Sequence, residues 1–181
     1  MQLIIIGHTG FIGSELSNYY STNNEFKEIK LISSKEVDLT SNKSIKYLKK
    51  QYKKNTVIIF CAGIKRQLGD NIDIFEKNML ITKNFAKSFS NNIKKIIFFS
   101  SAAVYGEDTP RHYKINENTN ADPKSYYGLS KYISEIILKK TLEGKKTKLI
   151  SLRLPLVYGL NDMSMGYGPT QFTMCSLKNK P

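Results

Sequence analysis

Two side chains that could move a proton stand four residues apart, at Tyr127 and Lys131. On a helix, both would project from one face, one turn apart. A phenol with a pKa of about 10 is a weak acid and a weak base at neutral pH, whereas a nearby ammonium group stabilises the phenolate and lowers that pKa. The pair could therefore exchange a proton with an alcohol. The spacing alone decides nothing, because a chain this rich in Tyr and Lys produces such a pair by chance.

A glycine turn at the start of the chain is the second candidate for chemistry. The apolar run Gln2–Ile6 predicts a short buried strand, and Gly7, Gly10 and Gly13 follow it at the entry to a helical pattern. In such a turn Gly7 would bend the chain, Gly10 would let phosphates approach the backbone, and Gly13 would let the helix pack closely. A plain strand-to-helix turn is the alternative. The position of the turn at the start of an alternating strand and helix pattern favours a pyrophosphate site.

The residues after the second predicted strand bear on which dinucleotide would bind. A strand over 29–32 ends at Ser33, Ser34 and Lys35. Folds that bind NAD place an acidic residue about twenty positions after the glycines, where it takes the ribose hydroxyls. Hydroxyls followed by a lysine suit a 2′-phosphate better, so the sequence favours NADP over NAD. Glu36 lies close enough to keep NAD open.

Strands and helices alternate along the rest of the chain. Apolar runs predict strands over 37–39, 56–61, 96–99 and 149–154, the last of them a sixth strand, and helical periodicity predicts helices ending near Tyr52 and spanning 72–89 and 126–142. This order is typical of an α/β protein, a Rossmann-like doubly wound parallel sheet in three αβα layers. The glycine turn, Ala62–Gly63 and Ser100–Ser101 would then meet at the carboxyl edge of the sheet, where ligands bind.

Taken together, the motifs resemble the extended short-chain dehydrogenase/reductase family, the NAD-dependent epimerases and dehydratases that modify nucleotide sugars. The resemblance runs from Gln2 to about Gly159 and rests on the glycine turn, on Ser-Ser-Ala-Ala-Val-Tyr-Gly from residue 100 and on Tyr-Gly-x-Ser-Lys from residue 127. It implies that Tyr127 is the general acid/base. It also implies that Lys131 lowers the pKa of Tyr127 and holds the nicotinamide ribose, and that Ser101 hydrogen-bonds the reacting oxygen.

The resemblance further implies a set of cofactor-binding residues at the strand ends. This set comprises Gly7, Thr9, Gly10, Phe11, Ile12, Gly13, Ser33, Ser34, Lys35, Asp38, Leu39, Cys61, Ala62, Gly63, Asn78, Ser100, Tyr127, Lys131 and Leu154. Asp38 matches an acidic position that contacts the adenine, and Asn78 matches an Asn ahead of the active site. Alternatives stay open for both, with Asp38 as a cap or turn residue and Asn78 as an exposed polar residue on a helix. Ser101 could likewise be an ordinary hydroxyl at a strand end.

Two departures from the family pattern narrow the chemistry. Ala102–Ala103 stand where dehydratases carry an Asp-Glu pair, so dehydration is disfavoured, and Leu156 stands where many epimerases place a substrate-binding Asn. Family members also continue into a substrate-binding region that is largely absent from this chain. We expect a dinucleotide-binding domain over 1–168 and the start of a substrate-binding region over 169–181.

Composition argues against several other classes of protein. The net charge of +13 suggests a nucleic-acid partner, but the lysines are spread along the whole chain and Arg is scarce, so we expect no such partner. Cys61, Cys175 and two His lack metal-site spacing, so no metal is expected and Cys61 is expected in the core. The chain shows no signal peptide and no apolar run of membrane-spanning length, which predicts a cytoplasmic protein without a membrane partner.

The sequence therefore predicts an NAD(P)-dependent epimerase or oxidoreductase acting on a nucleotide-activated sugar. Ser33–Lys35 favours net reduction with a dissociable cofactor, whereas the overall motif pattern favours epimerisation. A non-catalytic dinucleotide-binding or redox-sensing module is the alternative. The long helices over 72–89 and 126–142 have wide apolar faces, which indicates a homodimer.

Overall fold

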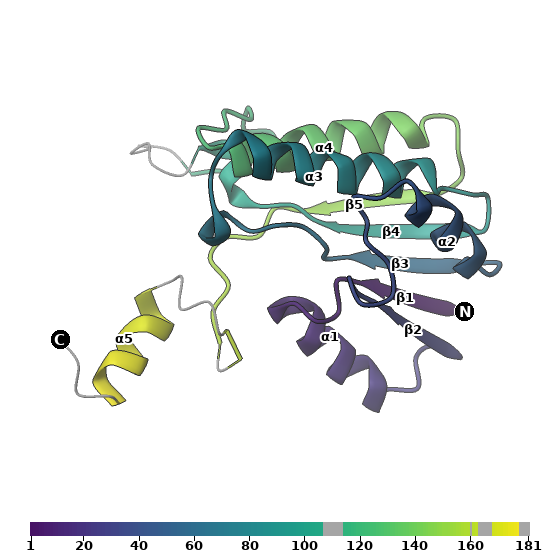
Figure 1. The fold of residues 1–181 in the computed structure, drawn as a ribbon, viewed down its shortest axis with the longest axis horizontal. Coiled ribbons are helices and arrows are strands. Elements are labelled where there is room, and N and C mark those ends of the chain that lie inside the picture. The colour runs from purple at the N-terminus through teal and green to yellow at the C-terminus, as the bar shows by residue number, and fades with distance from the viewer. Residues whose placement is uncertain (107–113, 160, 163–167, 178–181) are drawn as a thin grey trace.

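The computed structural model describes residues 1–106, 114–159, 161–162 and 168–177 (Figure 1). Within them the chain forms a five-stranded sheet in the order β2-β1-β3-β4-β5, with every neighbouring pair parallel. The strands are β1 (Gln2–Ile6), β2 (Glu28–Ile32), β3 (Thr56–Phe60), β4 (Ile93–Phe99) and β5 (Lys148–Leu152). The helices are α1 (Phe11–Thr22), α2 (Lys43–Gln51), α3 (Ile72–Lys87), α4 (Tyr126–Leu142) and α5 (Gly168–Leu177).

Helices cover both faces of the sheet, with α1 on one face and α2, α3 and α4 on the other (Figure 1). The central strands alternate their side chains between two apolar clusters. Leu3 and Ile5 of β1 pack with α1, whereas Ile4 and Ile6 pack in the larger cluster with α2 to α4. All five residues of β1 are buried, which explains why the strand is apolar on both faces. The predicted doubly wound, three-layer α/β fold is confirmed.

The predicted third strand over 37–39 is wrong. Two carboxylates instead hold residues 33–40 in turns. Glu36 accepts hydrogen bonds from the backbone N–H and the hydroxyl of Ser33, at 2.7 and 2.6 Å, and Asp38 accepts from the backbone N–H of Thr40 at 2.8 Å. These local bonds compete with a strand ladder for the same backbone groups. Leu39 packs in the larger core cluster.

The predicted strand over 149–154 ends two residues earlier, at Leu152, and it is the fifth strand of the described part rather than the sixth. The backbone carbonyl of Leu154 accepts from the N–H of Ala102 at 2.8 Å, so the chain leaves the sheet toward the segment after β4. Beyond it, α5 lies apart from the sheet layers (Figure 1). The domain boundary expected at residue 168 stays a prediction, and residues 178–181 lie outside the described part.

Candidate active site

A cavity of about 960 Å³ opens at the carboxyl edge of the sheet. Its walls come from the glycine turn, from the segments after β3, β4 and β5, and from the first two turns of α4. Predicted site residues that line it are Gly7, Gly10, Phe11, Ile12, Gly13, Cys61, Gly63, Ser100, Ser101, Tyr127, Lys131 and Leu154. The topology therefore brings the candidate phosphate site and the candidate proton-transfer pair into one cavity.

The glycine turn depends on the lack of side chains at Gly7 and Gly13. Gly7 has a φ of +91°, and a Cβ atom there would lie 2.7 Å from the backbone nitrogen of Ala62. A Cβ atom on Gly13 would lie 2.2 Å from the carbonyl oxygen of Gly7, so only glycine lets α1 start against the turn. At Gly10 the nearest atom would be 3.4 Å away, which leaves this position open to an approaching group. These are the roles that a dinucleotide-binding turn requires.

Lys131 lies against the end of β4 and beside Tyr127. Its Nζ donates to the carbonyl oxygen of Phe99 at 2.8 Å and lies 5.7 Å from the centre of the Tyr127 ring. Burial lowers the pKa of Lys131 to about 8, while the nearby Cys61 and Glu135 act in the opposite direction. The amine therefore loses its proton closer to neutral pH than an ordinary lysine does.

Lys131→Met is expected to raise the free energy of unfolding at pH 7 by about 1–3 kcal/mol. Met keeps a side chain of similar length but removes the buried ammonium group. The folded-state pKa of about 8 is below that of an unfolded lysine. The unfolded chain therefore binds more protons between the two values, and the cost of Lys131 fades as the pH rises through that window. Urea unfolding at pH 7 and pH 9.5 checks this expectation. Lys139→Met on the exposed face of α4 is the control, and a Lys131→Met chain less stable than wild type at pH 7 would contradict it.

Ser101 lies at the start of a short 3-10 helix, Ala102–Tyr105, which packs on the first turn of α4. Its hydroxyl accepts from the N–H of Ala103 at 3.2 Å, and a Cβ atom on Gly128 would lie 2.5 Å from the carbonyl oxygen of Ala103. Ser125 caps α4 by accepting from the N–H of Gly128. The absent side chain of Gly128 thus lets the Ser101 segment lie close to Tyr127. The cap bond fits the reading of Ser101 as a strand-end hydroxyl, although its place on the cavity wall also suits a catalytic role.

Other predicted residues do not line the cavity, namely Thr9, Ser33, Ser34, Lys35, Asp38, Leu39, Ala62 and Asn78. Asp38 is exposed and holds a turn, in line with the turn alternative. Asn78 is buried, so its reading as an exposed helix residue is wrong. Its amide side chain bonds both the N–H and the carbonyl of Ile64, at 2.8 and 3.0 Å. Asn78 therefore fixes the loop that carries Gly63 into the cavity.

Several lining residues were missing from the predicted set. They are Lys65, Arg66, Gln67, Leu68, Phe99, Ala102, Ala103, Gly106, Ile115, Pro155, Leu156, Val157 and Asp162. The 65–68 segment belongs to the loop that follows β3 at the carboxyl edge of the sheet, and this position in the sequence could have predicted its place on the cavity wall. Asp70, just beyond it, accepts from the backbone N–H of Tyr127 at 2.9 Å and ties the segment to the start of α4.

At the end of β2 a carboxylate takes up the hydroxyl of Ser33. Ser33 is buried, and its hydroxyl donates to Glu36, whose Oε2 also lies 3.9 Å from Nε2 of His8 in the glycine turn. The hydrogen bonds from Ser33 lower the pKa of Glu36, so the carboxylate is charged at neutral pH. A negative charge therefore stands beside the glycine turn, where sequence alone favoured a phosphate-binding group.

Comparison with known proteins places this architecture in a family. A family model described as "NAD dependent epimerase/dehydratase family" matches residues 3–176. The chain belongs to this family. A UDP-glucose 4-epimerase of Mycoplasma genitalium is 27% identical, over 87% of this chain and 53% of its own length. The resemblance to the extended short-chain dehydrogenase/reductases is thus confirmed.

Solved structures show the same fold. A Thermus thermophilus UDP-glucose 4-epimerase in complex with NAD aligns with all of this chain and 64% of its own, with a TM-score of 0.84 and 23% identity. A Bacillus cereus UDP-glucuronic acid 4-epimerase aligns with a TM-score of 0.81 and 19% identity, again over 64% of its length. The chain therefore spans about half to two thirds of the length of these three relatives.

The described residues were compared with the requirements of a metal site and of a membrane-spanning helix. Over these residues, His, Cys, Asp and Glu side chains form no cluster of three or more that could hold a metal ion. No helix in the same part of the chain is long and apolar enough to cross a membrane.

Proposed function

We propose that the chain is the cofactor-binding and proton-transfer part of an NAD-dependent epimerase that acts on a nucleotide-activated sugar. One observation carries the proposal, which is that Ser101, Tyr127 and Lys131 share a single cavity with the glycine turn. The family supports an enzyme of this kind, and a relative such as the M. genitalium UDP-glucose 4-epimerase suggests a UDP-sugar. Ala102–Ala103 line the cavity without an acidic side chain, which disfavours dehydration.

The cavity fits a dinucleotide. A Cβ atom at Gly7 or Gly13 would clash with backbone atoms, so only glycine builds this turn, while Gly10 leaves room for phosphate oxygens beside the start of α1. We propose that Gly10 to Gly13 hold the pyrophosphate, that Gly63 lies along the cofactor, and that Lys131 holds the nicotinamide ribose. A dinucleotide held there would supply the group that takes a hydride from the sugar carbon and gives it back.

Tyr127 would take the proton from the sugar hydroxyl at its Oη and later give it back. Lys131 lies close enough to stabilise the phenolate, and its bond to Phe99 holds its ammonium in place. Ser101 would donate its hydroxyl hydrogen to the reacting oxygen. The wall residues Leu154 and Leu156 would exclude water from the reacting face.

The cofactor is proposed to be NAD rather than NADP. The NADP preference inferred from Ser33, Ser34 and Lys35 stays untested, but the Ser33 hydroxyl is already bonded to Glu36. A charged carboxylate can accept the hydrogen bonds of ribose hydroxyls and repels a 2′-phosphate. Glu36 therefore favours NAD.

A Glu36→Gln substitution should narrow the preference for NADH over NADPH by about tenfold, because it removes the repulsion but keeps a hydrogen-bonding side chain. Paired titrations with NADH and NADPH measure this. Glu25→Gln, which changes an exposed carboxylate ahead of β2, is the control. A wild-type chain that binds NADPH more tightly, with no effect of Glu36→Gln, would restore the NADP prediction.

The substrate class is tested by incubating the chain and NAD with UDP-, GDP- and dTDP-activated sugars and following the products by NMR. We expect inversion at a sugar carbon without loss of water. Cofactor binding with no turnover of any sugar would instead favour the non-catalytic dinucleotide-binding module.

A homodimer through α3 and α4 is also proposed, since the two helices pack side by side and leave Leu80 and Ile136 exposed. Light scattering that reports only monomer would remove this proposal. The cytoplasmic location and the lack of nucleic-acid or membrane partners stay predictions from the sequence.

A further inference from the structure

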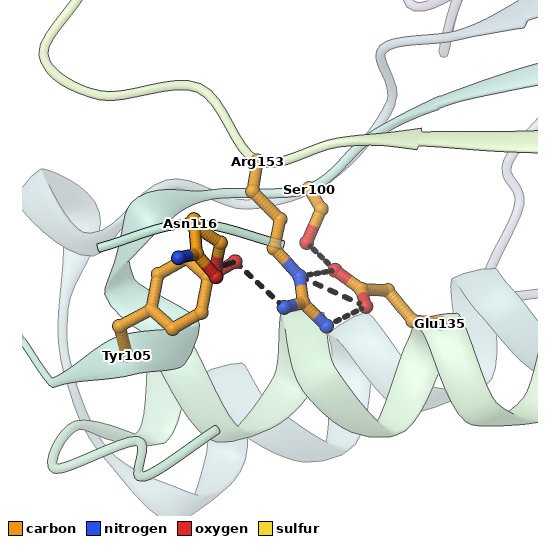
Figure 2. Close-up of polar contacts among 5 residues, drawn as sticks. All are labelled: Ser100, Tyr105, Asn116, Glu135 and Arg153. Atoms are coloured by element: carbon orange, nitrogen blue, oxygen red, sulfur yellow. Dashed lines mark hydrogen bonds and ion pairs between the residues drawn. The ribbon is translucent and has the colours of Figure 1, made fainter. Parts of the chain in front are cut away.

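A chain of polar side chains joins α4 to the ends of β4 and β5 (Figure 2). Glu135 stands one helical turn after Lys131, and its carboxylate accepts a short hydrogen bond from the hydroxyl of Ser100. The guanidinium of Arg153 donates to both oxygens of the same carboxylate. Its Nη2 lies 2.7 Å from Oε2, and its Nε lies 3.1 Å from Oε1 and 3.2 Å from Oε2. Such a forked ion pair fixes the orientation of both groups.

The chain continues beyond Arg153. Its Nη1 donates to the hydroxyl of Tyr105 at 2.9 Å, and that hydroxyl donates to the carbonyl oxygen of Asn116 at 3.2 Å. The Arg153 side chain also lies over the Tyr105 ring, with Cζ 4.9 Å from the ring centre. Both charged side chains are mostly buried, with exposed fractions of 25% for Arg153 and 12% for Glu135. Screening by water is therefore weak, and the pair holds its geometry.

Helix α4 thus bonds two consecutive residues, the last residue of β4 and the one after it, from one face. Lys131 bonds the carbonyl of Phe99, Glu135 bonds the side chain of Ser100, and Ser101 comes next on the cavity wall. The spacing between Tyr127 on α4 and Ser101 after β4 depends on this attachment. Arg153, directly after the neighbouring strand β5, holds the Glu135 carboxylate in place.

We propose that Glu135, held by Arg153, is a positioning residue that fixes the Ser101 segment relative to Tyr127 and places a negative charge one helical turn from Lys131. The proposal rests on the proposed function of that site, but its geometry does not involve the cofactor or the sugar. Tyr127 and Glu135 on α4, Cys61 from β3 and Arg153 after β5 are the titratable groups near Lys131. Burial raises the pKa of Cys61 to about 12, which leaves its thiol neutral where Lys131 titrates.

The two partners should act on Lys131 in opposite directions. Glu135→Gln removes a negative charge and leaves Arg153 uncompensated, so the pKa of Lys131 should fall. Arg153→Met leaves the Glu135 carboxylate uncompensated, so the pKa of Lys131 should rise. A role confined to holding the fold together would not give opposite signs, since loss of structure returns Lys131 toward an ordinary lysine in both variants.

Competitive acetylation of the chain with acetic anhydride, read peptide by peptide by mass spectrometry across pH 6 to 11, measures the titration of Lys131 without cofactor or sugar. We expect the pKa of Lys131 to fall by about 0.5 or more in Glu135→Gln and to rise by about 0.5 or more in Arg153→Met. Arg153→Lys, which keeps the charge, and Glu143→Gln, which changes an exposed carboxylate after α4, should leave Lys131 unchanged. If the pKa of Lys131 moves in the same direction in both variants, or in neither, the proposal is overturned. If the Arg153→Met chain does not melt cooperatively, Arg153→Gln takes its place.

Turnover gives an independent second readout. Glu135→Gln should lower kcat about tenfold or more and leave KM within about twofold, because it misplaces reacting groups without removing a substrate contact. A matched rise in KM with unchanged kcat would contradict a positioning role. If the wild-type chain turns over no sugar, the proposed function fails while the acetylation experiment still decides this inference.

Discussion

Tyr127→Phe is expected to reduce turnover of the nucleotide sugar by about 10²–10⁴-fold, the usual contribution of a general acid/base. The substitution removes only the phenol oxygen, and the ring that lies 5.7 Å from Nζ of Lys131 remains in place. The dissociation constant for NADH should therefore stay within about twofold of wild type. Single-turnover assays and a cofactor titration on the same preparation measure the two quantities.

The neighbouring residue supplies the control. Tyr126 begins α4, is 43% exposed and packs its ring 6.1 Å from the ring of Phe75, away from the lining of the cavity. Tyr126→Phe should leave turnover unchanged. Unchanged turnover in Tyr127→Phe would remove the assignment of Tyr127 as the acid/base.

Gly13→Ala is expected to have the second-largest effect, because its new Cβ atom would lie 2.2 Å from the carbonyl oxygen of Gly7. Moving the backbone of the turn costs more free energy than moving a flexible side chain, so α1 must shift away from the turn. We expect a loss of about 1–3 kcal/mol in the free energy of unfolding and at least about a tenfold loss in cofactor affinity. Thermal melting and NADH titration measure the two effects.

Gly10→Ala is the matched control, because its Cβ atom would have no contact shorter than 3.4 Å. It should melt like wild type yet bind the cofactor more weakly, since the added methyl occupies the space proposed for phosphate. Wild-type affinity in Gly10→Ala would place the pyrophosphate elsewhere. A fully stable Gly13→Ala chain would contradict the close packing of α1 on the turn.

The order of strands and helices was predictable because each element carries its own periodicity. The run Gln2–Ile6 is buried on both faces, and α4 spans Tyr126–Leu142 as its apolar spacing predicts. The strand predicted over 37–39 was wrong, because a short alternating run does not show that Glu36 and Asp38 accept the local hydrogen bonds. Side-chain competition of this kind depends on geometry that no pattern encodes.

The candidate site was predictable where motifs are local and unpredictable where contacts are distant in sequence. Tyr127 and Lys131 are four residues apart, so their shared face follows from helix geometry alone. Glu135 and Arg153 come together from a helix and the end of a strand, and Asp70 reaches Tyr127 across 57 positions. The sequence predicts Asn78 as a cofactor contact, with an exposed helix position as the alternative, whereas the fold buries it against Ile64.

Titration of the purified chain with NADH and with NADPH, followed by cofactor fluorescence and by thermal melting, tests the central claim most directly. The account predicts saturable binding of NADH, at lower concentration than NADPH, with a rise in melting temperature that grows with ligand concentration. Binding that Gly13→Ala abolishes would locate the cofactor at the glycine turn. A wild-type chain that melts cooperatively but binds neither dinucleotide would contradict the account.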